Sequence, residues 1–564
     1  MRRDRVWIAL GLIGMLIIML TVVVLWLRQC SFYSKETDPH IYLSFEEQED
    51  GTYVVSGFSG QAVRNVVIPA THNDKRVTGI ADNAFGCKYN GMLDLSTLPL
   101  ESVVIEEGIT DIGSTAFNDR LVGSVVLPDS VTRIGASAFN STGAEIDWPA
   151  GLKQLGGRAF FGCTFRNDVD LTGVACDEYG LSGSSVRSID IPQDWEAVPE
   201  GMFSFCEKLE WVTLPAGLTR IEPATFQRCT ALSEIGLPVG TAFIGDRAFE
   251  YSGIREIVFE NEVLEIADYA FENCNNLQSL VFPSRGNVTL GRSFSSCPAL
   301  DTVDFGDSVV LFKTTPFIGC PVRDMRVGAD SELEIVDGCL CRREPDGTYT
   351  VLVGCAYPAG FDKFAAIESE AFRGKNLGNI RLGENIRDIG YAAFSWSVID
   401  SAEIACDEIS ECAFYCADIS ELRISSRKVG DEAFHYVAGL TEVVLEEGCE
   451  AIGDQAFSSC EEVQRIYLPA SLKEVGNRAF VACYELTEVY YALRQGTPAA
   501  LHVGHFATYV RRSRKEKGWG LKDDFRIYVY DTVYDGCKTK WRRQPWDPKY
   551  DYIDSLADRI VRRD

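Results

Sequence analysis

Residues of the kind that carry metal or acid–base chemistry are scarce, and they match no common catalytic motif. The 564-residue chain has only 5 histidines, and none stands in a His-Glu-x-x-His arrangement, which is typical of zinc proteases. The sequence also has no glycine-rich phosphate loop ending in Lys-Ser or Lys-Thr and no Gly-x-Ser-x-Gly turn, so nucleotide and hydrolase chemistry lose support. We predict that the protein is not an enzyme, and we name no catalytic, cofactor-binding or metal-binding residue and no cofactor.

Positive charge is also scarce over most of the chain. The formal net charge is -28, and residues 36–510 hold 34 basic and 71 acidic side chains. Such a surface repels phosphate backbones, which argues against nucleic acid as a partner. Residues 511–564 are basic, with fifteen Lys or Arg and ten Asp or Glu. They include an expected exposed loop at 511–518, which is more consistent with a solvated loop than with a site for anionic polymers.

The remaining candidates for chemistry have simpler structural interpretations. Three pairs of adjacent carboxylates occur, Glu46-Glu47, Glu106-Glu107 and Glu446-Glu447. The last two pairs each follow an expected strand and precede a glycine, which is typical of a solvated turn. Cys412-x-x-x-Cys416 has zinc-ligand types but no second pair at ligand spacing. His502 and His505 could hold a metal only with ligands from elsewhere.

One long uncharged run stands near the N-terminus. Val6 to Leu27 carry no charge, and 22 helical residues extend about 33 Å, enough to span a bilayer. We predict a retained transmembrane helix at 6–27, with cleavage as the alternative, because the run ends in Trp26, Leu27 and Arg28 rather than in small residues. Arg2, Arg3 and Arg5 place residues 1–5 in the cytoplasm and the rest of the chain outside it.

A short motif, apolar-x-x-x-Ala-Phe, recurs through the rest of the chain. It ends at Phe85, Phe117, Phe139, Phe160, Phe249, Phe271, Phe372, Phe394, Phe414, Phe434, Phe457 and Phe480, with variants ending at Phe203, Phe226, Phe294 and Phe317. From Phe203 to Phe317 the spacing is 22 or 23 residues. A period of this length predicts a solenoid in which each repeat forms one coil and neighbouring coils stack their apolar residues into a continuous core.

Within a repeat, the alternation of apolar and polar residues predicts one short strand. In the best-preserved copy it lies between Leu209 and Pro215, with Val212 and Leu214 on the inner face. The proline ends the strand because it lacks a backbone donor. Equivalent strands are expected before Pro283 and Pro469.

Departures from the period mark the expected insert and caps. The 55 residues between Phe317 and Phe372 contain Cys339–Cys341 and Tyr349–Leu352 around an Asp-Gly turn, which predicts a hairpin insert at about 335–358. Residues 174–179 are expected to form a degenerate coil. We divide the chain into residues 1–5, the helix at 6–27, a linker and N-terminal cap at 28–60, the solenoid at 61–490, and a degenerate repeat and cap at 491–564.

Eight of the 19 cysteines keep phase with the repeat. These eight lie three residues after the motif phenylalanine: Cys163, Cys206, Cys229, Cys274, Cys297, Cys320, Cys460 and Cys483. Residues at one point of every coil form one column, and cysteine suits a buried column. We expect these to be free thiols. Cys339, Cys341, Cys355, Cys412 and Cys416 fall outside the column and are the better candidates for disulfide pairing.

The repeat, with Ile-x-x-x-Ala-Phe-x-x-Cys followed by Leu-x-x-Val-x-Leu-Pro, resembles the leucine-rich repeats of BspA-like bacterial surface proteins over about residues 50–550. The resemblance implies an α/β repeat solenoid, a right-handed leucine-rich-repeat superhelix with short parallel strands and short helical turns. It also implies an extracytoplasmic location and a binding or adhesive role, and it identifies no ligand.

The expected partner is therefore a protein or glycan outside the cell, bound by outward residues of the strands. These include Glu210, Trp211, Thr213, Ser233, Glu234, Arg255, Glu256, Arg323, Asp324, Arg326, Gln464, Arg465 and Tyr467. They are polar, mixed in charge and sparsely aromatic, and many of them could serve only to solvate the surface. The alternative is a passive envelope scaffold or spacer without an external ligand. A hidden hydrolase is the least favoured hypothesis.

Overall fold

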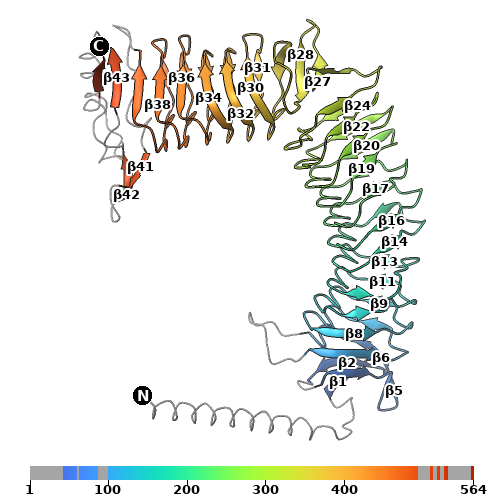
Figure 1. Ribbon diagram of the computed structural model, residues 1–564. Helices are drawn as coiled ribbons and strands as arrows, with labels where there is room; N and C mark the ends of the chain where they lie inside the picture. The colour runs from blue at the N-terminus through green and yellow to red at the C-terminus, as the bar shows by residue number, and fades with distance from the viewer. Residues whose placement is uncertain are drawn as a thin grey trace, which may run out of the picture. The chain divides into compact units, whose positions relative to one another are not determined.

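The computed structural model describes residues 42–59, 63–86, 99–492, 508–511, 517–520, 526–530 and 560–563. The chain divides into two compact units, Met1–Val186 and Arg187–Asp564. In each unit short strands follow one another in parallel, one coil after the next (Figure 1). The predicted solenoid of parallel strands is confirmed.

The first unit contains two sheets, one on each side of the coils. The first runs in the order β1-β2-β5-β7-β9-β11-β13, with β4 paired to β5, and the second in the order β12-β10-β8-β6-β3. Their strands are β1 Leu43–Glu47, β2 Tyr53–Phe58, β3 Asn65–Ile68, β4 Thr71–His72, β5 Lys75–Ile80, β6 Leu100–Ile105, β7 Asp111–Ile112, β8 Val122–Val126, β9 Arg133–Ile134, β10 Glu145–Ile146, β11 Gln154–Leu155, β12 Thr164–Phe165 and β13 Ala175–Cys176.

The second unit begins with three sheets of the same kind, in the orders β14-β16, β15-β17-β18-β20-β22-β24 and β19-β21-β23-β25. Their strands are β14 Ser188–Asp190, β15 Ala197–Val198, β16 Trp211–Thr213, β17 Arg220–Ile221, β18 Phe243–Ile244, β19 Glu256–Val258, β20 Val263–Ile266, β21 Ser279–Val281, β22 Asn287–Leu290, β23 Thr302–Asp304, β24 Val309–Phe312 and β25 Asp324–Arg326.

The rest of the second unit holds the sheets β26-β27-β28-β29-β31, β30-β32-β34-β36-β38-β40-β43-β44, β33-β35-β37-β39 and β41-β42. Their strands are β26 Leu333–Val336, β27 Cys339–Arg343, β28 Tyr349–Val353, β29 Phe364–Ile367, β30 Asn376–Leu382, β31 Asp388–Ile389, β32 Val398–Ile404, β33 Glu408–Ile409, β34 Asp418–Ile424, β35 Lys428–Val429, β36 Glu442–Leu445, β37 Ala451–Ile452, β38 Arg465–Leu468, β39 Glu474–Val475, β40 Glu488–Tyr491, β41 Thr508–Arg511, β42 Lys517–Gly520, β43 Arg526–Tyr530 and β44 Ile560–Arg563.

Each regular coil therefore has two strands where the sequence predicted one. The predicted strand is present; for example, β16 buries Val212 and exposes Trp211 and Thr213. The additional strand ends on the first residue of the motif, as in β18, where Ile244 is buried and pairs with Ile221 of β17. Many of these strands have only two residues, which is too short to show an alternating pattern.

The predicted helical turns are wrong, because the described residues contain no α-helix. Arg247 lies two residues before Phe249 and has a φ of 54°. Tyr251 lies two residues after it and has a φ of 58°. A helix requires negative φ throughout. The Phe249 amide donates to the Ala270 carbonyl of the next coil at 2.7 Å rather than to its own segment. The motif is thus a chain of tight turns that hydrogen-bond between coils.

The motif phenylalanines form the core. Their rings stack on those of the neighbouring coils; for example, Phe226 and Phe249 have centroids 5.3 Å apart and planes inclined by 15°. The stack runs from Phe203 to Phe317 and, beyond the insert, from Phe372 to Phe480. Within the first unit it runs from Phe85 to Phe160. These buried, in-phase rings are what the period predicted.

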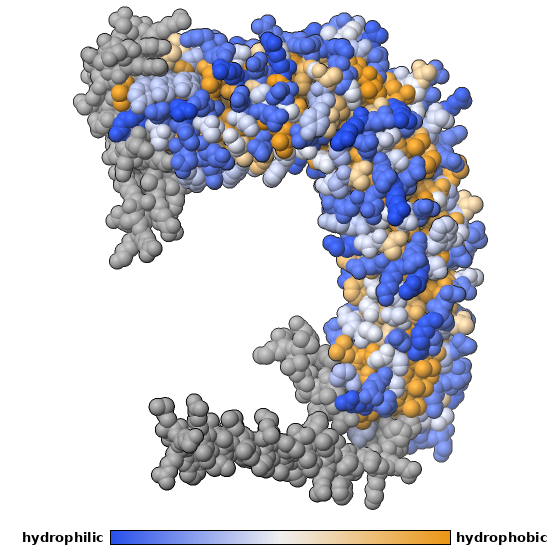
Figure 2. Space-filling model, in the orientation of Figure 1, coloured by the Kyte–Doolittle hydropathy of each residue, from blue (hydrophilic) through white to orange (hydrophobic). Residues whose placement is uncertain are grey.

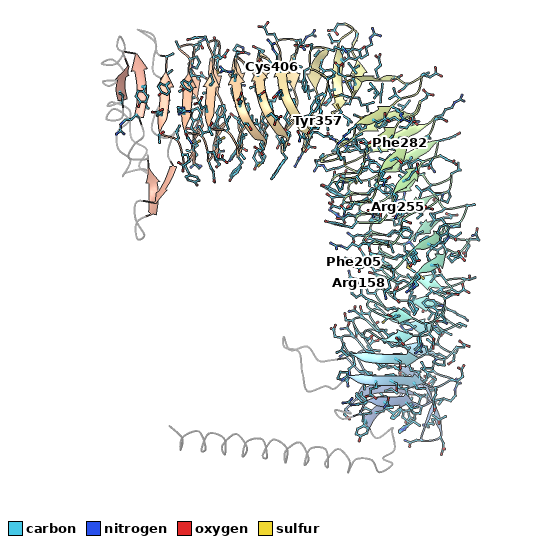
Figure 3. All side chains as sticks on the ribbon, in the orientation of Figure 1. Arg158, Phe205, Arg255, Phe282, Tyr357 and Cys406 are labelled. Atoms are coloured by element: carbon cyan, nitrogen blue, oxygen red, sulfur yellow. The ribbon has the colours of Figure 1, made fainter. Side chains whose placement is uncertain are left out.

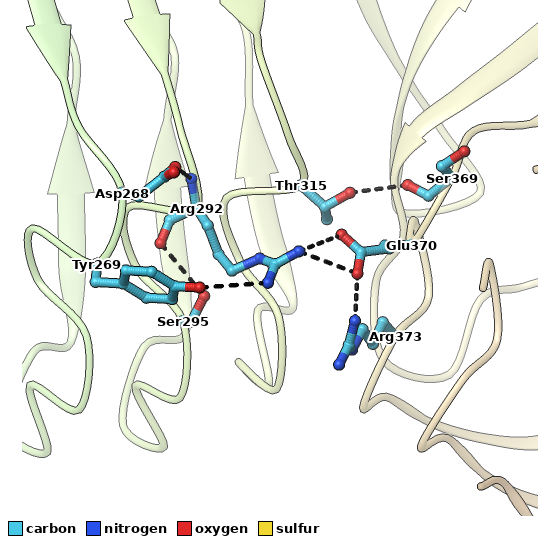
Figure 4. Close-up of polar contacts among 8 residues, drawn as sticks. All are labelled: Asp268, Tyr269, Arg292, Ser295, Thr315, Ser369, Glu370 and Arg373. Carbon is cyan, nitrogen blue, oxygen red and sulfur yellow. Dashed lines mark hydrogen bonds and ion pairs between the residues drawn. The ribbon is translucent and has the colours of Figure 1, made fainter. Parts of the chain in front are cut away.

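The insert in the second unit has three strands, β26, β27 and β28, paired antiparallel, where a two-strand hairpin was predicted. Hydrogen bonds join the coils on either side of it (Figure 4). The Arg292 guanidinium donates to Glu370 at 2.8 and 3.1 Å, and the Thr315 hydroxyl donates to the Ser369 carbonyl at 2.9 Å. Glu370 also pairs with Arg373. The coils on the two sides of the insert are thus in direct contact.

Both ends of the described solenoid carry extra strands. β1 pairs antiparallel with β2, and Phe58 of β2 stacks on Phe85 at 5.0 Å. At the other end β43 pairs parallel with β40, and β44 with β43. The described part of the chain holds no helix with the length and hydrophobicity that crossing a membrane requires. The predicted transmembrane helix at 6–27 lies outside the described residues.

Candidate functional site

The eight cysteines that lie three residues after a motif phenylalanine, hereafter the column cysteines, have a structural role. All eight lie among the described residues and are buried free thiols, as predicted. The Cys460 thiol points to the carbonyl oxygen of Phe434 in the preceding coil, with sulfur and oxygen 3.1 Å apart. Burial raises the pKa of Cys460 to about 12, so it stays protonated and can donate this hydrogen bond. Six further column cysteines make the same contact: Cys163, Cys229, Cys274, Cys297, Cys320 and Cys483.

A lysine takes the place of cysteine after the insert. Lys375 lies three residues after Phe372, and its side chain is buried. Its ammonium donates to the carbonyls of Phe317, at 3.1 Å, and of Cys320. Burial lowers the pKa of Lys375 below its ordinary value. The longer side chain still binds the carbonyl of the preceding phenylalanine, so Lys375 has a structural role.

The other sequence candidates also have structural roles or lie outside the described residues. The described residues contain no group of three or more His, Cys, Asp or Glu side chains placed to hold a metal ion, and this includes Cys412 and Cys416. Glu106 and Glu447 accept hydrogen bonds from the backbone amides of Ala70 and Ala470, at 2.8 and 3.0 Å. His502 and His505 are not among the described residues.

The described cysteines outside the column are free thiols as well. Cys339 of β27 and Cys355 approach most closely, with their sulfur atoms 3.4 Å apart and both side chains buried. Cys341 makes its contact with the Cys339 carbonyl instead. These thiols pack inside the insert and do not line an exposed site.

The outward strand residues form the surface that the sequence nominated for binding, hereafter the strand face. Exposed members are Glu210, Trp211, Thr213, Glu234, Arg255, Glu256, Arg323, Arg326 and Gln464; Ser233, Asp324, Arg465 and Tyr467 are half-buried. Figure 2 shows hydrophilic and hydrophobic residues interspersed on the visible side of the coils. The surface has the mixed polarity expected from the sequence.

Many charges of the strand face are paired with a neighbouring coil. Arg187 lies 3.8 Å from Glu210, and Arg323 lies 3.9 Å from Asp301. Arg465 pairs with Glu442. Exposed pairs of this kind contribute only about 0–1 kcal/mol each to stability. They nevertheless neutralise one another, so the paired charges offer little to an incoming ligand.

Trp211 is the most prominent aromatic side chain of the strand face. Its side chain is 58% exposed, and its cross-strand neighbour on β14 is the small Ser188. On the other side the next coil has no strand at 233–237, so the strand ladder is interrupted beside Trp211. Arg255, labelled in Figure 3, belongs to the coil after this gap. A large exposed indole is typical of a recognition surface.

Sequence reasoning missed a second surface, on the turns of the motif. Figure 3 shows Phe205, two residues after Phe203, on the side of the coils away from β14 and β16. At this position and its neighbours, aromatic side chains are exposed in several coils: Trp396 by 57%, Tyr436 by 51% and Tyr391 by 54%. The signal was an aromatic residue two or three positions from the motif phenylalanine. We call this the turn face.

Comparison with known proteins gives a family match. The model described as "BspA type Leucine rich repeat region (6 copies)" matches residues 95–210, 196–323, 361–428 and 427–494, more than half of the chain. No curated protein matches.

Solved structures include similar proteins. A leucine-rich repeat protein from Bacteroides ovatus is 19% identical, with a TM-score of 0.37, and the match covers 88% of this chain and all of that one. A leucine rich cell surface protein from Faecalibacterium prausnitzii is 21% identical, with a TM-score of 0.27 and coverage of 81% and 95%. The T. pallidum leucine-rich repeat protein is 22% identical, with a TM-score of 0.30 and coverage of 36% and 92%.

Proposed function

Because the chain belongs to the BspA-type leucine-rich-repeat family, we propose that it is an extracytoplasmic binding protein that recognises a protein or polysaccharide through its strand face. The observation that carries the proposal is Trp211, which exposes 58% of its side chain beside the gap in the strand ladder. The family and fold are those of repeat proteins that generally act as scaffolds, and no catalysis is part of the proposal.

We further propose that the segment at 6–27 anchors the protein in the cell membrane and leaves the repeats outside. The absence of charge from Val6 to Leu27 and the arginines before it support this orientation. Protease added to intact cells should then digest the repeats.

A binding experiment separates recognition from a passive scaffold role. Purified protein is offered to immobilised cell-wall polymer, matrix proteins and secreted proteins. We expect saturable binding to one class, weakened about tenfold by Trp211→Ala, because a central exposed tryptophan contributes on the order of 1–2 kcal/mol or more to an interface.

Thr213→Ala is the matched control, since Thr213 lies on the same exposed face of β16. It should change affinity by less than about twofold. Failure to bind any of the three classes saturably would favour the spacer role. Equal effects of the two substitutions would show that the ligand binds elsewhere.

A further inference from the structure

The turn face carries two trios of residues with the same backbone geometry, each with an aromatic residue at either end. The middle residue is an arginine in the first trio, the closed trio, and a cysteine in the second, the open trio. Each trio lies two residues after consecutive motif phenylalanines. In the first, Phe205, Arg228 and Tyr251 have φ of 58–61°, and in the second, Trp396, Cys416 and Tyr436 have φ of 56–59°. The backbone amide of each member donates to the next coil at 2.7–3.0 Å. The two trios therefore start their side chains from equivalent backbone positions.

In the closed trio the middle residue fills the space between the rings. The Arg228 guanidinium carbon lies 5.4 Å from the ring centroid of Phe205 and 4.7 Å from that of Tyr251. Both distances are within the range of cation–π attraction. The chain thus shows that two turn-face rings, two coils apart, accommodate one guanidinium between them.

In the open trio the middle residue is the short Cys416, which is half-buried, while Trp396 and Tyr436 each expose more than half of their side chains. Two coil spacings of about 4.8 Å separate the outer residues. His435 stacks on Tyr436 at 4.3 Å, and Tyr415 meets Tyr436 edge-on at 6.1 Å. These contacts build an aromatic platform, and no lysine or arginine of the described residues lies over the Trp396 or Tyr436 ring as Arg228 does over the rings of the first trio.

The charges around the open trio complement a cation. Glu411 and Asp431 are exposed and Glu432 is half-buried. Within the described part of the chain no lysine or arginine forms an ion pair with these three carboxylates. Glu432 lies 3.5 Å from His435 and accepts a hydrogen bond from the Gln455 side-chain amide at 3.3 Å, and Asp431 accepts one from the Asp454 backbone amide at 2.7 Å. Arg373, in a preceding coil, pairs with Glu370, and its charge also acts on the Cys416 thiol.

Acids that directly precede the short strands β33 and β37 have basic partners instead. Asp407 pairs with Arg427 at 2.8 Å, and Glu450 pairs with Lys473 at 2.7 Å. Negative charge without an internal counterion is thus concentrated beside the exposed rings.

We propose that the turn face around Trp396, Cys416 and Tyr436 binds an arginine side chain of an extended, basic segment of a partner protein. The guanidinium occupies the position that Arg228 fills in the first trio, between the indole and the phenol, and the neighbouring carboxylates attract the segment. This surface is separate from the strand face, so the proposal does not depend on the function proposed for the strand face.

The test uses the full chain and a fluorescent peptide of alternating arginine and glycine, with a glutamate–glycine peptide and a neutral oligosaccharide as comparison probes. We expect the arginine peptide to bind, with an affinity that falls as salt is added. Trp396→Ala should weaken binding about fivefold, because loss of one ring removes on the order of 1 kcal/mol of cation–π attraction.

The decisive variant is Cys416→Arg, which should place the protein's own guanidinium between the rings and abolish peptide binding. Cys416→Ser is the matched control and should bind normally. The double variant Glu411→Gln/Glu432→Gln should weaken peptide binding while the aromatic rings stay unchanged. It tests the proposal even if Cys416→Arg does not fold.

Binding of the arginine peptide that is unchanged in both Cys416→Arg and Trp396→Ala would overturn the proposal. Trp396-dependent binding of the oligosaccharide in place of the peptide would overturn it too, and would reassign the platform to a glycan. Trp211→Ala should leave peptide binding unchanged, which separates this site from the strand face.

Discussion

At the scale of single residues, the buried cysteine column shows why the same side chain recurs in many coils. A cysteine three residues after the motif phenylalanine is small enough for the core and still donates to the phenylalanine carbonyl of the preceding coil, as Cys460 does. Thr142 and Ser397 stand at the same position and donate through their hydroxyls to the phenylalanine of their own coil, at 2.9 and 2.6 Å. The sequence predicted the burial of this column, but the hydrogen bond was visible only in three dimensions.

This hydrogen bond predicts how Cys460 tolerates substitution. Cys460→Ala removes both a donor and a buried sulfur, and should lower the free energy of unfolding by about 1–3 kcal/mol. Cys460→Ser keeps a donor of similar size and should cost less. Urea unfolding of the two variants measures the difference. A larger loss for serine than for alanine would mean that the sulfur acts only as an apolar filler.

At the scale of elements, a glycine directly after the second strand sets how closely neighbouring coils approach. A Cβ on Gly245, which follows β18, would lie 2.5 Å from the Pro223 nitrogen and 2.8 Å from the Glu222 carbonyl carbon of the coil before. Glycine recurs at this point, as Gly135 and Gly453 illustrate. The repeated glycine was readable in the sequence, yet its cause is a contact between residues more than twenty positions apart.

Gly245→Ala should therefore be destabilising. The methyl group meets backbone atoms that cannot rotate away, so we expect a loss of about 1–3 kcal/mol or more in the free energy of unfolding, measured by thermal or urea denaturation. Gly217→Ala is the control, because a Cβ there meets no atom within 4 Å. It should change stability by no more than about 0.5 kcal/mol or raise it slightly. Similar losses for both would refute the close-packing explanation.

The two strands of a coil were not equally predictable. The strand before the proline has an alternating pattern, and β16 and β38 lie where that pattern placed them. The strand that ends on the first motif residue has only two residues in many coils, and its partners are set by stacking of coils rather than by a local pattern. The expected helical turns failed for a related reason: the amides bond to the next coil, which a local pattern cannot reveal.

At the scale of the whole molecule, each coil contacts chiefly the coils before and after it, so disturbances should remain local. Phe457 is fully buried and stacks on Phe434 at 5.0 Å and on Phe480 at 5.5 Å. Phe457→Ala should remove about 3–5 kcal/mol of local stability. Hydrogen exchange should show faster exchange in the coils of these three residues and unchanged protection around Phe249. Uniform loss of protection across the second unit would indicate a single cooperative core instead.

The sequence alone determined the repeat, the buried phenylalanine and cysteine columns and the acidic character of the body, because each is a property of side chains that recur at a regular spacing. Only the tertiary structure decided which residues become neighbours across coils. Trp396, Cys416 and Tyr436 are twenty residues apart in sequence, and they form one surface because stacking reduces that separation to a coil spacing of about 4.8 Å. The physical reason is that the candidate sites are built from single residues of different coils, and neighbours of that kind leave no local pattern.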